Sequence, residues 1–138
     1  MLDTIVTIAS DKIEQMKMRN AESSFLLLEE GLKTEADQIA THCGGGAVNA
    51  AVAAARLGHA TSAIVKVGRD EKAKMILGRL GEEGVDLKWI SVDNEAPTGA
   101  SVIISSHDRN AAIFTYRGAN TRLKAADFPV EAFADKDL

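Results

Sequence analysis

The chain has 138 residues, of which 46% are hydrophobic and 26% charged, and carries a formal net charge of −4. This length suits one domain with a single core. The acidic balance argues against nucleic-acid binding, which calls for a clustered basic face, and the most basic stretch, residues 66–79, is interleaved with Asp70 and Glu71 like a solvated helix face. One cysteine cannot form an internal disulfide, and neither a signal peptide nor a long apolar run is recognisable, so we expect a cytoplasmic protein.

Strands and helices are expected to alternate along the first two thirds of the chain. Short apolar strands are predicted at residues 5–9 and 24–30, the second ending at Gly31. Residues 47–57 are almost all small or apolar, which predicts a buried helix with Gly58 as its left-handed stop. Residues 63–67 are largely apolar on both faces and are expected to form a central parallel strand.

Asp70 is expected to cap a second helix, whose apolar residues recur at helical spacing: Ala73, Ile76, Leu77 and Leu80. A strand at residues 86–92 would follow through a right-handed crossover. Beyond Pro97, strands at residues 100–105 and 111–116 flank the polar residues 106–110, a pattern typical of an antiparallel hairpin. The fold class predicted is therefore α/β.

The run Gly44-Gly45-Gly46 opens the first predicted helix and is followed by Asn49. Glycines let backbone amides approach a ligand, and the first N–H groups of a helix have no partners within it. A dinucleotide-binding fingerprint would need a third glycine where Asn49 stands, and a phosphate-binding P-loop would need a Gly-Lys pair, which the chain lacks. The alternative is structural, namely a turn into a tightly packed helix.

The spacing of two glycines, a small residue, Asn49, Gly58 and Gly68 resembles the first signature of the ribokinase-like (PfkB) carbohydrate kinase family. Four further segments extend the resemblance over nearly the whole chain, although Ala73 stands where the family often has glycine; they are Gly68-Arg69-Asp70, Gly84-Val85, Thr98-Gly99 and Arg117-Gly118-Ala119-Asn120.

The resemblance implies a partial ribokinase-like fold, with a mostly parallel sheet flanked by helices and a small antiparallel β lid. Residues 1–138 would form an incomplete domain, since members of the family are about twice as long. The lid would comprise about residues 4–41 and 98–117, and the α/β core about residues 44–92 and 118–138.

The resemblance also implies four substrate-binding residues: Asp3, Gly45, Gly46 and Asn49. A carboxylate at Asp3 can accept hydrogen bonds from two neighbouring sugar hydroxyls, and an amide at Asn49 can donate and accept at once. The backbone of Gly45 and Gly46 would lie against the sugar ring. Without the family resemblance, the interpretation of both side chains would be structural: Asp3 as a surface residue at a strand end, and Asn49 as a helix-start residue that hydrogen-bonds to its own backbone.

His42 and Cys43 are adjacent to the glycine run, but two side chains are fewer than a zinc site needs, and His107 falls in a separate turn. We therefore predict no metal site within this chain. Cys43 is expected to be a small buried residue rather than a nucleophile.

The function that the resemblance implies is ATP-dependent phosphorylation of a sugar hydroxyl, with Mg²⁺ neutralising phosphate charge. It places the catalytic base and the residues that bind ATP and Mg²⁺ outside this chain, so the chain alone should be inactive. Which sugar, sugar acid or nucleoside is the substrate stays open. The alternative is a non-catalytic sugar-binding or self-assembling module, and in both cases we expect a homo-oligomer formed through the lid strands, with neither nucleic acid nor membrane as partner.

Overall fold

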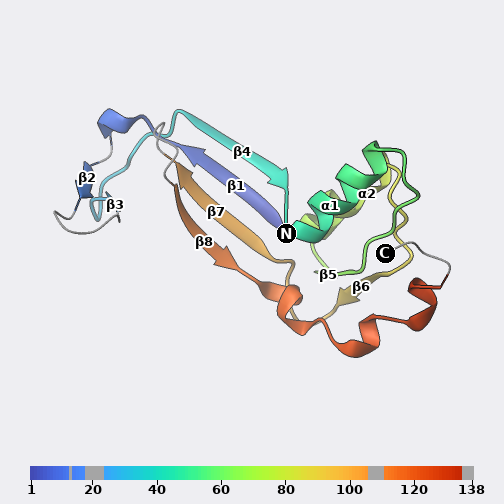
Figure 1. Cartoon of the computed structure of the whole chain (residues 1–138). Coiled ribbons are helices and arrows are strands. Elements are labelled where there is room, and N and C mark those ends of the chain that lie inside the picture. Colours follow the sequence, from blue (N-terminus) through green and yellow to red (C-terminus); the bar gives the residue numbers. More distant parts are fainter. Residues whose placement is uncertain (13, 18–23, 106–110, 135–138) are drawn as a thin grey trace. The chain divides into compact units, whose positions relative to one another are not determined.

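Along the described part of the chain, strands and one short 3-10 helix come first, two α-helices with a strand between them follow, and further strands and three more 3-10 helices come last (Figure 1). The computed structural model describes residues 1–12, 14–17, 24–105 and 111–134. Its contacts divide into two compact units, each described here by itself: unit 1 comprises Met1–Asp3, His42–Ala100 and Thr115–Leu138, and unit 2 comprises Thr4–Thr41 and Ser101–Phe114. The elements are β1 (Leu2–Thr7), η1 (Ser10–Lys12), β2 (Glu14–Lys17), β3 (Ser24–Leu27), β4 (Gln38–Cys43), α1 (Gly46–Arg56), β5 (Val65–Gly68), α2 (Glu71–Glu82), β6 (Ile90–Asp93), β7 (Ala100–Ser105), β8 (Ala111–Tyr116), η2 (Gly118–Arg122), η3 (Ala125–Asp127) and η4 (Val130–Ala132).

Helix α1 confirms the helix predicted at residues 47–57, and its end has a defined cause. Gly58 has a φ of 90°, a left-handed conformation that favours glycine. Its N–H donates to the carbonyl of Ala55 at 2.9 Å, and the N–H of His59 donates to that of Ala54 at 3.1 Å. This pair of hydrogen bonds is the Schellman motif, which satisfies carbonyls that the end of a helix would otherwise leave unpaired.

Helix α2 is capped at both ends. Asp70 Oδ1 accepts a hydrogen bond from the N–H of Ala73 at 2.9 Å, which confirms the predicted N-cap. At the other end Gly84, with a φ of 75°, and Val85 repeat the Schellman hydrogen bonds, and Val85 is itself buried. The helix therefore begins and ends where its own sequence specifies.

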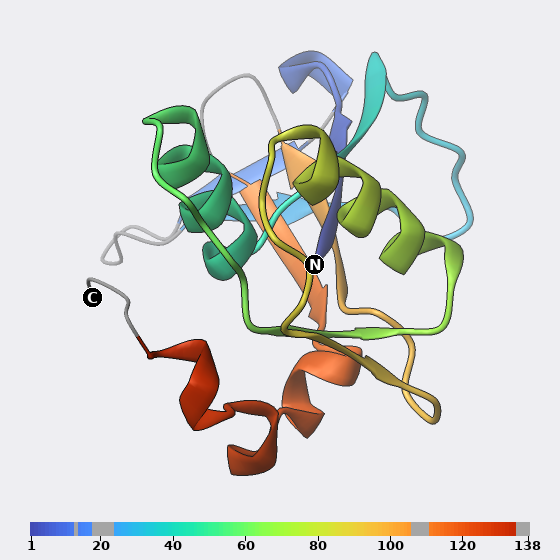
Figure 2. The same cartoon turned by 90° about the vertical axis from the view of Figure 1, so that its right-hand side faces the viewer.

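The core of unit 1 lies between the two helices and the strands beneath them. Figure 2 shows α1 and α2 side by side above β5. Strand β5 pairs in parallel with β6, from Val65 opposite Ile90 to Gly68 opposite Asp93. Six buried residues form the core cluster: Val48, Ala51, Ala63, Ile76, Leu80 and Val85. Because these apolar side chains bury the facing sides of α1 and α2, the start of each helix is held in a defined place.

The residues after β8 are fastened to the β5–β6 pair by two ion pairs. Lys66 Nζ lies 2.8 Å from Asp127 Oδ2, and both side chains are largely buried. Arg122 Nε donates to Asp93 Oδ2 at 2.7 Å. Hydrogen bonding from Lys66 lowers the pKa of the Asp127 carboxyl. These contacts hold the 3-10 helix η2, which contributes to the pocket described below.

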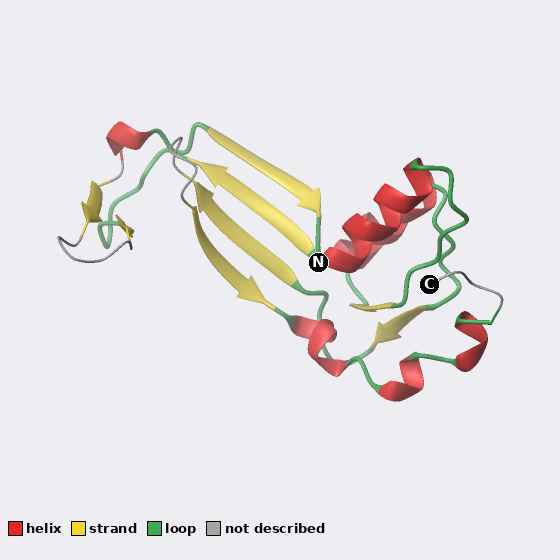
Figure 3. Ribbon diagram, in the orientation of Figure 1, coloured by secondary structure: helices red, strands yellow, loops and turns green. Residues whose placement is uncertain are grey.

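Four strands form a mixed sheet in the order β4-β1-β7-β8 (Figure 3). The N–H of Leu2 donates to Gly99 O, and the N–H of Ile8 donates to Ser105 O, both at 3.0 Å. The residue numbers of these two pairs rise together, so β1 and β7 run parallel. Strand β4 runs antiparallel to β1, because the N–H of Gly44 donates to Met1 O while that of Asp37 donates to Thr7 O, so the residue numbers change in opposite senses. The arrows of β7 and β8 also point in opposite directions in Figure 3.

Strands β2 and β3 form a separate antiparallel pair in unit 2, from Glu14 opposite Leu27 to Lys17 opposite Ser24. Strands β7 and β8 have the bounds predicted for the hairpin, while the predicted turn at residues 106–110 lies outside the described residues. The α/β class is confirmed. The lid role of residues 4–41 and 98–117 stays a prediction.

Four strand boundaries differ from those predicted. Strand β1 begins at Leu2 rather than at residue 5, so Asp3 lies inside a strand; β3 ends at Leu27, and β5 is shifted toward Gly68. The strand predicted at residues 86–92 is wrong in its first half. There Asp86 Oδ1 accepts from the N–H of Lys88 at 3.0 Å, which forms a turn, and only residue 86 itself bridges to Ser62.

Candidate functional site

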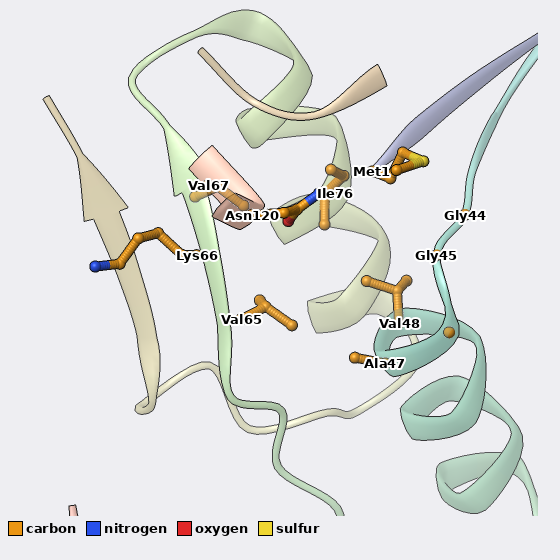
Figure 4. Close-up of a pocket in the computed structure, with 11 residues that line it drawn as sticks. Met1, Gly44, Gly45, Ala47, Val48, Val65, Lys66, Val67, Ile76 and Asn120 are labelled. Atoms are coloured by element: carbon orange, nitrogen blue, oxygen red, sulfur yellow. The ribbon is translucent and has the colours of Figure 1, made fainter. Parts of the chain in front are cut away.

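A pocket of about 210 Å³ in unit 1 lies between the start of α1 and strand β5 (Figure 4). Its walls are largely apolar, with the backbone of the glycine run along one side. The lining residues are Met1, Gly44, Gly45, Gly46, Ala47, Val48, Val65, Lys66, Val67, Ile76 and Asn120. The pocket therefore joins residues that the sequence placed far apart in the chain.

Asp3 lies directly against the first glycine of the run. A Cβ on Gly44 would stand 2.9 Å from Cγ of Asp3 and still closer to its Oδ2. Cβ atoms in proteins essentially never approach non-bonded atoms so closely. Gly44 is buried, and its N–H donates to the carbonyl of Met1 at 3.0 Å. The absence of a side chain at Gly44 thus makes room for the Asp3 carboxylate, a role that the sequence analysis did not assign.

The backbone requires glycine at Gly45 but not at Gly46. Gly45 is the residue before α1 and has φ 96° and ψ 141°, which side-chain-bearing residues rarely adopt. Gly46 is the first residue of α1, and a Cβ there would meet nothing within 4 Å. The chain itself does not require glycine at Gly46, so a side chain there would occupy only open space beside the pocket.

Asn49 lies elsewhere on α1. Its side chain is exposed and lines a second hollow of about 520 Å³, together with Cys43, Val52 and Arg79 among others. Neither Asn49 nor Asp3 is among the residues that line the pocket beside Gly46. The structure therefore brings Asp3, Gly45 and Gly46 to the start of α1 but places Asn49 on a different hollow, and its binding role stays a prediction.

Asn120 is a pocket residue to which the sequence analysis gave no role. Figure 4 shows its side chain across the pocket from the glycine run and directed toward it. It comes from η2, where the neighbouring Gly118 and Ala119 are buried and the N–H of Ala119 donates to Pro97 O at 2.8 Å. The signal was available, because Arg117-Gly118-Ala119-Asn120 is part of the recognised pattern.

The carboxylate of Asp70 links two of the recognised segments, Gly68-Arg69-Asp70 and Thr98-Gly99. Its Oδ1 accepts from the Thr98 hydroxyl at 2.7 Å and its Oδ2 from the Thr98 N–H at 2.8 Å. The Thr98 hydroxyl in turn accepts from the N–H of Gly68 at 2.9 Å. Burial opposes the charge, but the hydrogen bonds from Thr98 and Ala73 outweigh it and lower the pKa of Asp70.

Close backbone approach explains the glycines in this region. A Cβ on Gly68 would stand 2.5 Å from the backbone nitrogen of Thr98, and one on Gly99 would stand 2.5 Å from Nδ2 of Asn120. A Cβ on Gly118 would clash with the carbonyl oxygen of Pro97. The spacing of the recognised pattern thus reflects the packing of its segments against each other.

The thiol and metal alternatives have little support in the described residues. Cys43 Sγ donates to the carbonyl of Met75 at 3.5 Å, and burial raises the pKa of the thiol, which disfavours the reactive thiolate. Within residues 1–12, 14–17, 24–105 and 111–134, no group of three or more His, Cys, Asp or Glu side chains could hold a metal ion. His107 lies outside this part of the chain.

The resemblance assigns the residues that bind ATP and Mg²⁺ to a part of the protein outside this chain, and that assignment stays a prediction. None of the described helices is both long and apolar enough to cross a membrane.

Comparison with known proteins agrees with the geometry. Ribokinase of Arabidopsis thaliana is 33% identical over 114 residues, which cover 81% of this chain and 29% of that protein. A nucleoside kinase of Methanothermobacter thermautotrophicus is 29% identical over 89 residues, covering 64% of this chain and 29% of that protein. The structure of Arabidopsis thaliana ribokinase complexed with ribose and ATP matches with a TM-score of 0.68 at 28% identity, covering 86% of this chain and 34% of the other.

The chain thus spans about a third or less of the length of these proteins. The model of the pfkB family of carbohydrate kinases matches residues 8–138. That match includes the glycine run, Asn49 and Asn120 but begins after Asp3. Because it extends over nearly the whole chain and agrees with the fold, the chain belongs to the pfkB family of carbohydrate kinases.

Proposed function

We propose that this chain is the sugar-binding part of an ATP-dependent carbohydrate kinase, which transfers a phosphoryl group to a sugar hydroxyl. The observation that carries the proposal is the Asp3 carboxylate held against Gly44 at the start of α1, in a chain of the pfkB family. The reaction itself would belong to a longer protein, since the chain matches about a third of its structural relative.

The contribution of these residues would be orientation of the acceptor. An ionised Asp3 can accept from two neighbouring hydroxyls, with each charge-assisted bond worth about 1.5–3 kcal/mol. The bare backbone at Gly46 would let a sugar ring lie close to the N–H groups that open α1. Asn49 would bind a further hydroxyl as both donor and acceptor. Holding the acceptor hydroxyl in line accelerates transfer without any proton moving to these residues.

The phosphoryl donor is proposed to be ATP, with Mg²⁺ to neutralise phosphate charge when bound. The similar Arabidopsis structure is described as a complex with ribose and ATP. A cytoplasmic location would suit a protein that uses ATP. Ribose and a nucleoside are both reasonable acceptors, because the relatives include a ribokinase and a nucleoside kinase.

A second candidate is a sugar-binding module that assembles with copies of itself and has no catalysis of its own. Exposed apolar side chains on strands of unit 2 favour it: Phe25, Leu27, Ile39, Val102, Ile113 and Phe114 are each at least 40% exposed. Such a surface is often covered by a partner, and here a second copy pairing through the same strands would form a homo-oligomer.

The experiment compares Asp3→Ala with the wild type in the full-length protein that contains this chain. Loss of the charge-assisted hydrogen bonds should lower kcat/KM for the preferred sugar by at least about tenfold. Asn49→Ala should also lower kcat/KM. Cys43→Ser serves as the control, because the Cys43 side chain bonds to the carbonyl of Met75 and is not proposed to bind the sugar. Thermal melts should change little.

Sugar phosphorylation by the wild type, lost in Asp3→Ala without a fall in melting temperature, supports the kinase. Sugar binding without phosphorylation by the full-length protein would favour the module. An Asp3→Ala protein with wild-type kcat/KM would remove Asp3 from the site.

A further inference from the structure

The link between Asp70 and the substrate-binding end of β1 consists of short contacts. Thr98 is 1% exposed and donates to both oxygens of the Asp70 carboxylate, through its hydroxyl and its N–H. The next residue, Gly99, accepts the N–H of Leu2 at 3.0 Å. Leu2 is buried and directly precedes Asp3. The path from Asp70 to Asp3 therefore passes through two residues in sequence, Thr98 and Gly99, and one backbone hydrogen bond.

The other contacts of Gly99 leave its backbone little freedom to move. Its Cα faces Nδ2 of Asn120 and the carbonyl of Arg117, so closely that a Cβ would stand 2.5 and 2.7 Å from these atoms. Beyond Gly99 the chain enters β7, which pairs with β1. A shift of the Thr98–Gly99 segment would consequently be transmitted to the start of β1.

We propose that Asp70 is a positioning residue for substrate binding: acting through Thr98 and Gly99, it holds Leu2 and thereby sets the Asp3 carboxylate against Gly44. The inference rests on the proposed role of Asp3 in sugar binding. It assigns to Asp70 a task beyond capping α2, and the two tasks use different donors. The cap is the N–H of Ala73, whereas the positioning contacts are the hydroxyl and N–H of Thr98.

An ionised carboxylate suits the task because it only accepts hydrogen bonds, and here it receives three from two elements. In an Asp70→Asn variant, the side-chain NH₂ group, which is itself a donor, would face one of these donors. Thr98 is equally specific, since its hydroxyl must donate to Asp70 while it accepts from the N–H of Gly68. Valine at residue 98 has nearly the same shape but can do neither.

Substitutions at Thr98 separate positioning from capping because they leave the Asp70–Ala73 cap in place. In the full-length protein, Thr98→Val should raise the KM for the sugar at least about fivefold, with the KM for ATP unchanged. Thr98→Ser keeps the hydroxyl and should restore near wild-type kinetics. Lys74→Ala serves as the control on α2, where the Lys74 side chain forms an exposed ion pair with Glu71.

Amide hydrogen exchange supplies a readout that does not depend on activity. In Thr98→Val the Leu2 N–H, which bonds to Gly99, should exchange at least about fivefold faster than in the wild type. The N–H of Val85, which bonds to Leu80 at the end of α2, should change much less. Unequal acceleration at these two amides distinguishes local release of β1 from general destabilisation.

Each outcome has a definite meaning. Faster exchange at Leu2 together with a raised sugar KM supports the inference. An unchanged Leu2 amide, equal acceleration at Leu2 and Val85, or faster exchange at Leu2 with an unaltered sugar KM overturns it. A wild-type protein that neither binds nor phosphorylates any sugar overturns the proposed function, and the Leu2 exchange then still decides whether Asp70 and Thr98 hold β1.

Discussion

The carboxylate of Asp3 occupies the space that a side chain on Gly44 would need. Gly44→Ala should therefore displace the carboxylate while costing less than about 1 kcal/mol of stability, because only the end of a flexible side chain must move. In the full-length protein we expect kcat/KM for the sugar to fall nearly as far as in Asp3→Ala. Steady-state kinetics paired with thermal melts measure both effects. Wild-type kinetics in Gly44→Ala would mean that this placement of Asp3 does not matter for binding.

Alanine at the next two glycines should separate backbone strain from the need for space. Gly45→Ala should destabilise the protein by about 1–3 kcal/mol, because Gly45 has a φ of 96°. Gly46→Ala should leave stability unchanged or slightly raised, because alanine favours helix over glycine by about 1 kcal/mol or less and a Cβ there meets no atom within 4 Å. If a sugar ring lies against Gly46, however, its KM should rise. Chemical unfolding and sugar kinetics of the two variants test this, and a Gly46→Ala protein with unaltered KM would speak against it.

Asp93 should make stability depend on pH in acid solution. Hydrogen bonds from the N–H groups of Glu95 and Ala96, with Arg122 nearby, lower the pKa of Asp93 to about 2. The unfolded chain binds the proton more readily, at a pKa of about 3.9. The contribution of the carboxylate is therefore complete above about pH 4 and is lost as the pH falls toward 2.

Urea unfolding of the wild type and of Asp93→Asn between pH 2 and 6 measures this contribution. The difference in unfolding free energy should be constant at the upper end and shrink toward pH 2. The exposed Glu131, replaced by glutamine, is the control. A difference that stays constant over the whole range would show that the charge of Asp93 is not what stabilises the fold.

The 138-residue chain by itself should not phosphorylate sugars. The described residues provide neither a metal-binding cluster nor an assigned ATP site, and the chain covers 34% of the structurally similar ribokinase. A coupled assay for ADP formation with ribose, fructose and nucleosides checks this expectation. ATP-dependent product from chain free of other kinases would refute it.

Strand β8 should promote self-association. It is the last strand in the order of its sheet, and Ile113 and Phe114 on it are 62% and 61% exposed. Unpaired edges and apolar side chains together favour pairing with another copy. Sedimentation velocity should show a dimer or larger species at micromolar concentrations, and Phe114→Lys should shift it toward monomer. Val130→Lys is a matched control, because Val130 is 83% exposed but lies in η4, outside the sheet. Purely monomeric wild type would contradict the prediction.

The elements that the sequence predicted well are those specified by adjacent residues. Gly58 and Gly84 end the two helices through left-handed conformations, and Asp70 caps α2 through a residue three positions away. The bounds of β7 and β8 likewise follow from two apolar runs that flank a polar stretch. Local chemistry is sufficient in each of these cases.

One local feature was missed: apolar alternation did not reveal that the Asp86 side chain accepts a hydrogen bond from the N–H of Lys88 in a turn, which delays β6 until residue 90. Features that depend on distant partners were not predicted either. Nor could spacing show that Gly44 makes room for Asp3, or that Asn49 and Asn120 line different hollows. These relations arise from tertiary packing between segments about 40 to 70 residues apart in the chain, for which a single sequence carries no direct signal.

The parallel pairing of β1 with β7 also affects the order in which the protein can fold during synthesis. Residues 4–41 leave the ribosome first, but the strand that completes their sheet begins at Ala100, after an insertion of about 60 residues. At about 5–20 residues per second, synthesis of this insertion alone takes roughly 3–12 s, during which β1 lacks its partner. During that interval Ile8, which is buried in the completed structure and donates its N–H to Ser105, has no β7 to pair with. A chaperone that binds short apolar segments would therefore find its target on the nascent chain in residues 4–9, before β7 has been made.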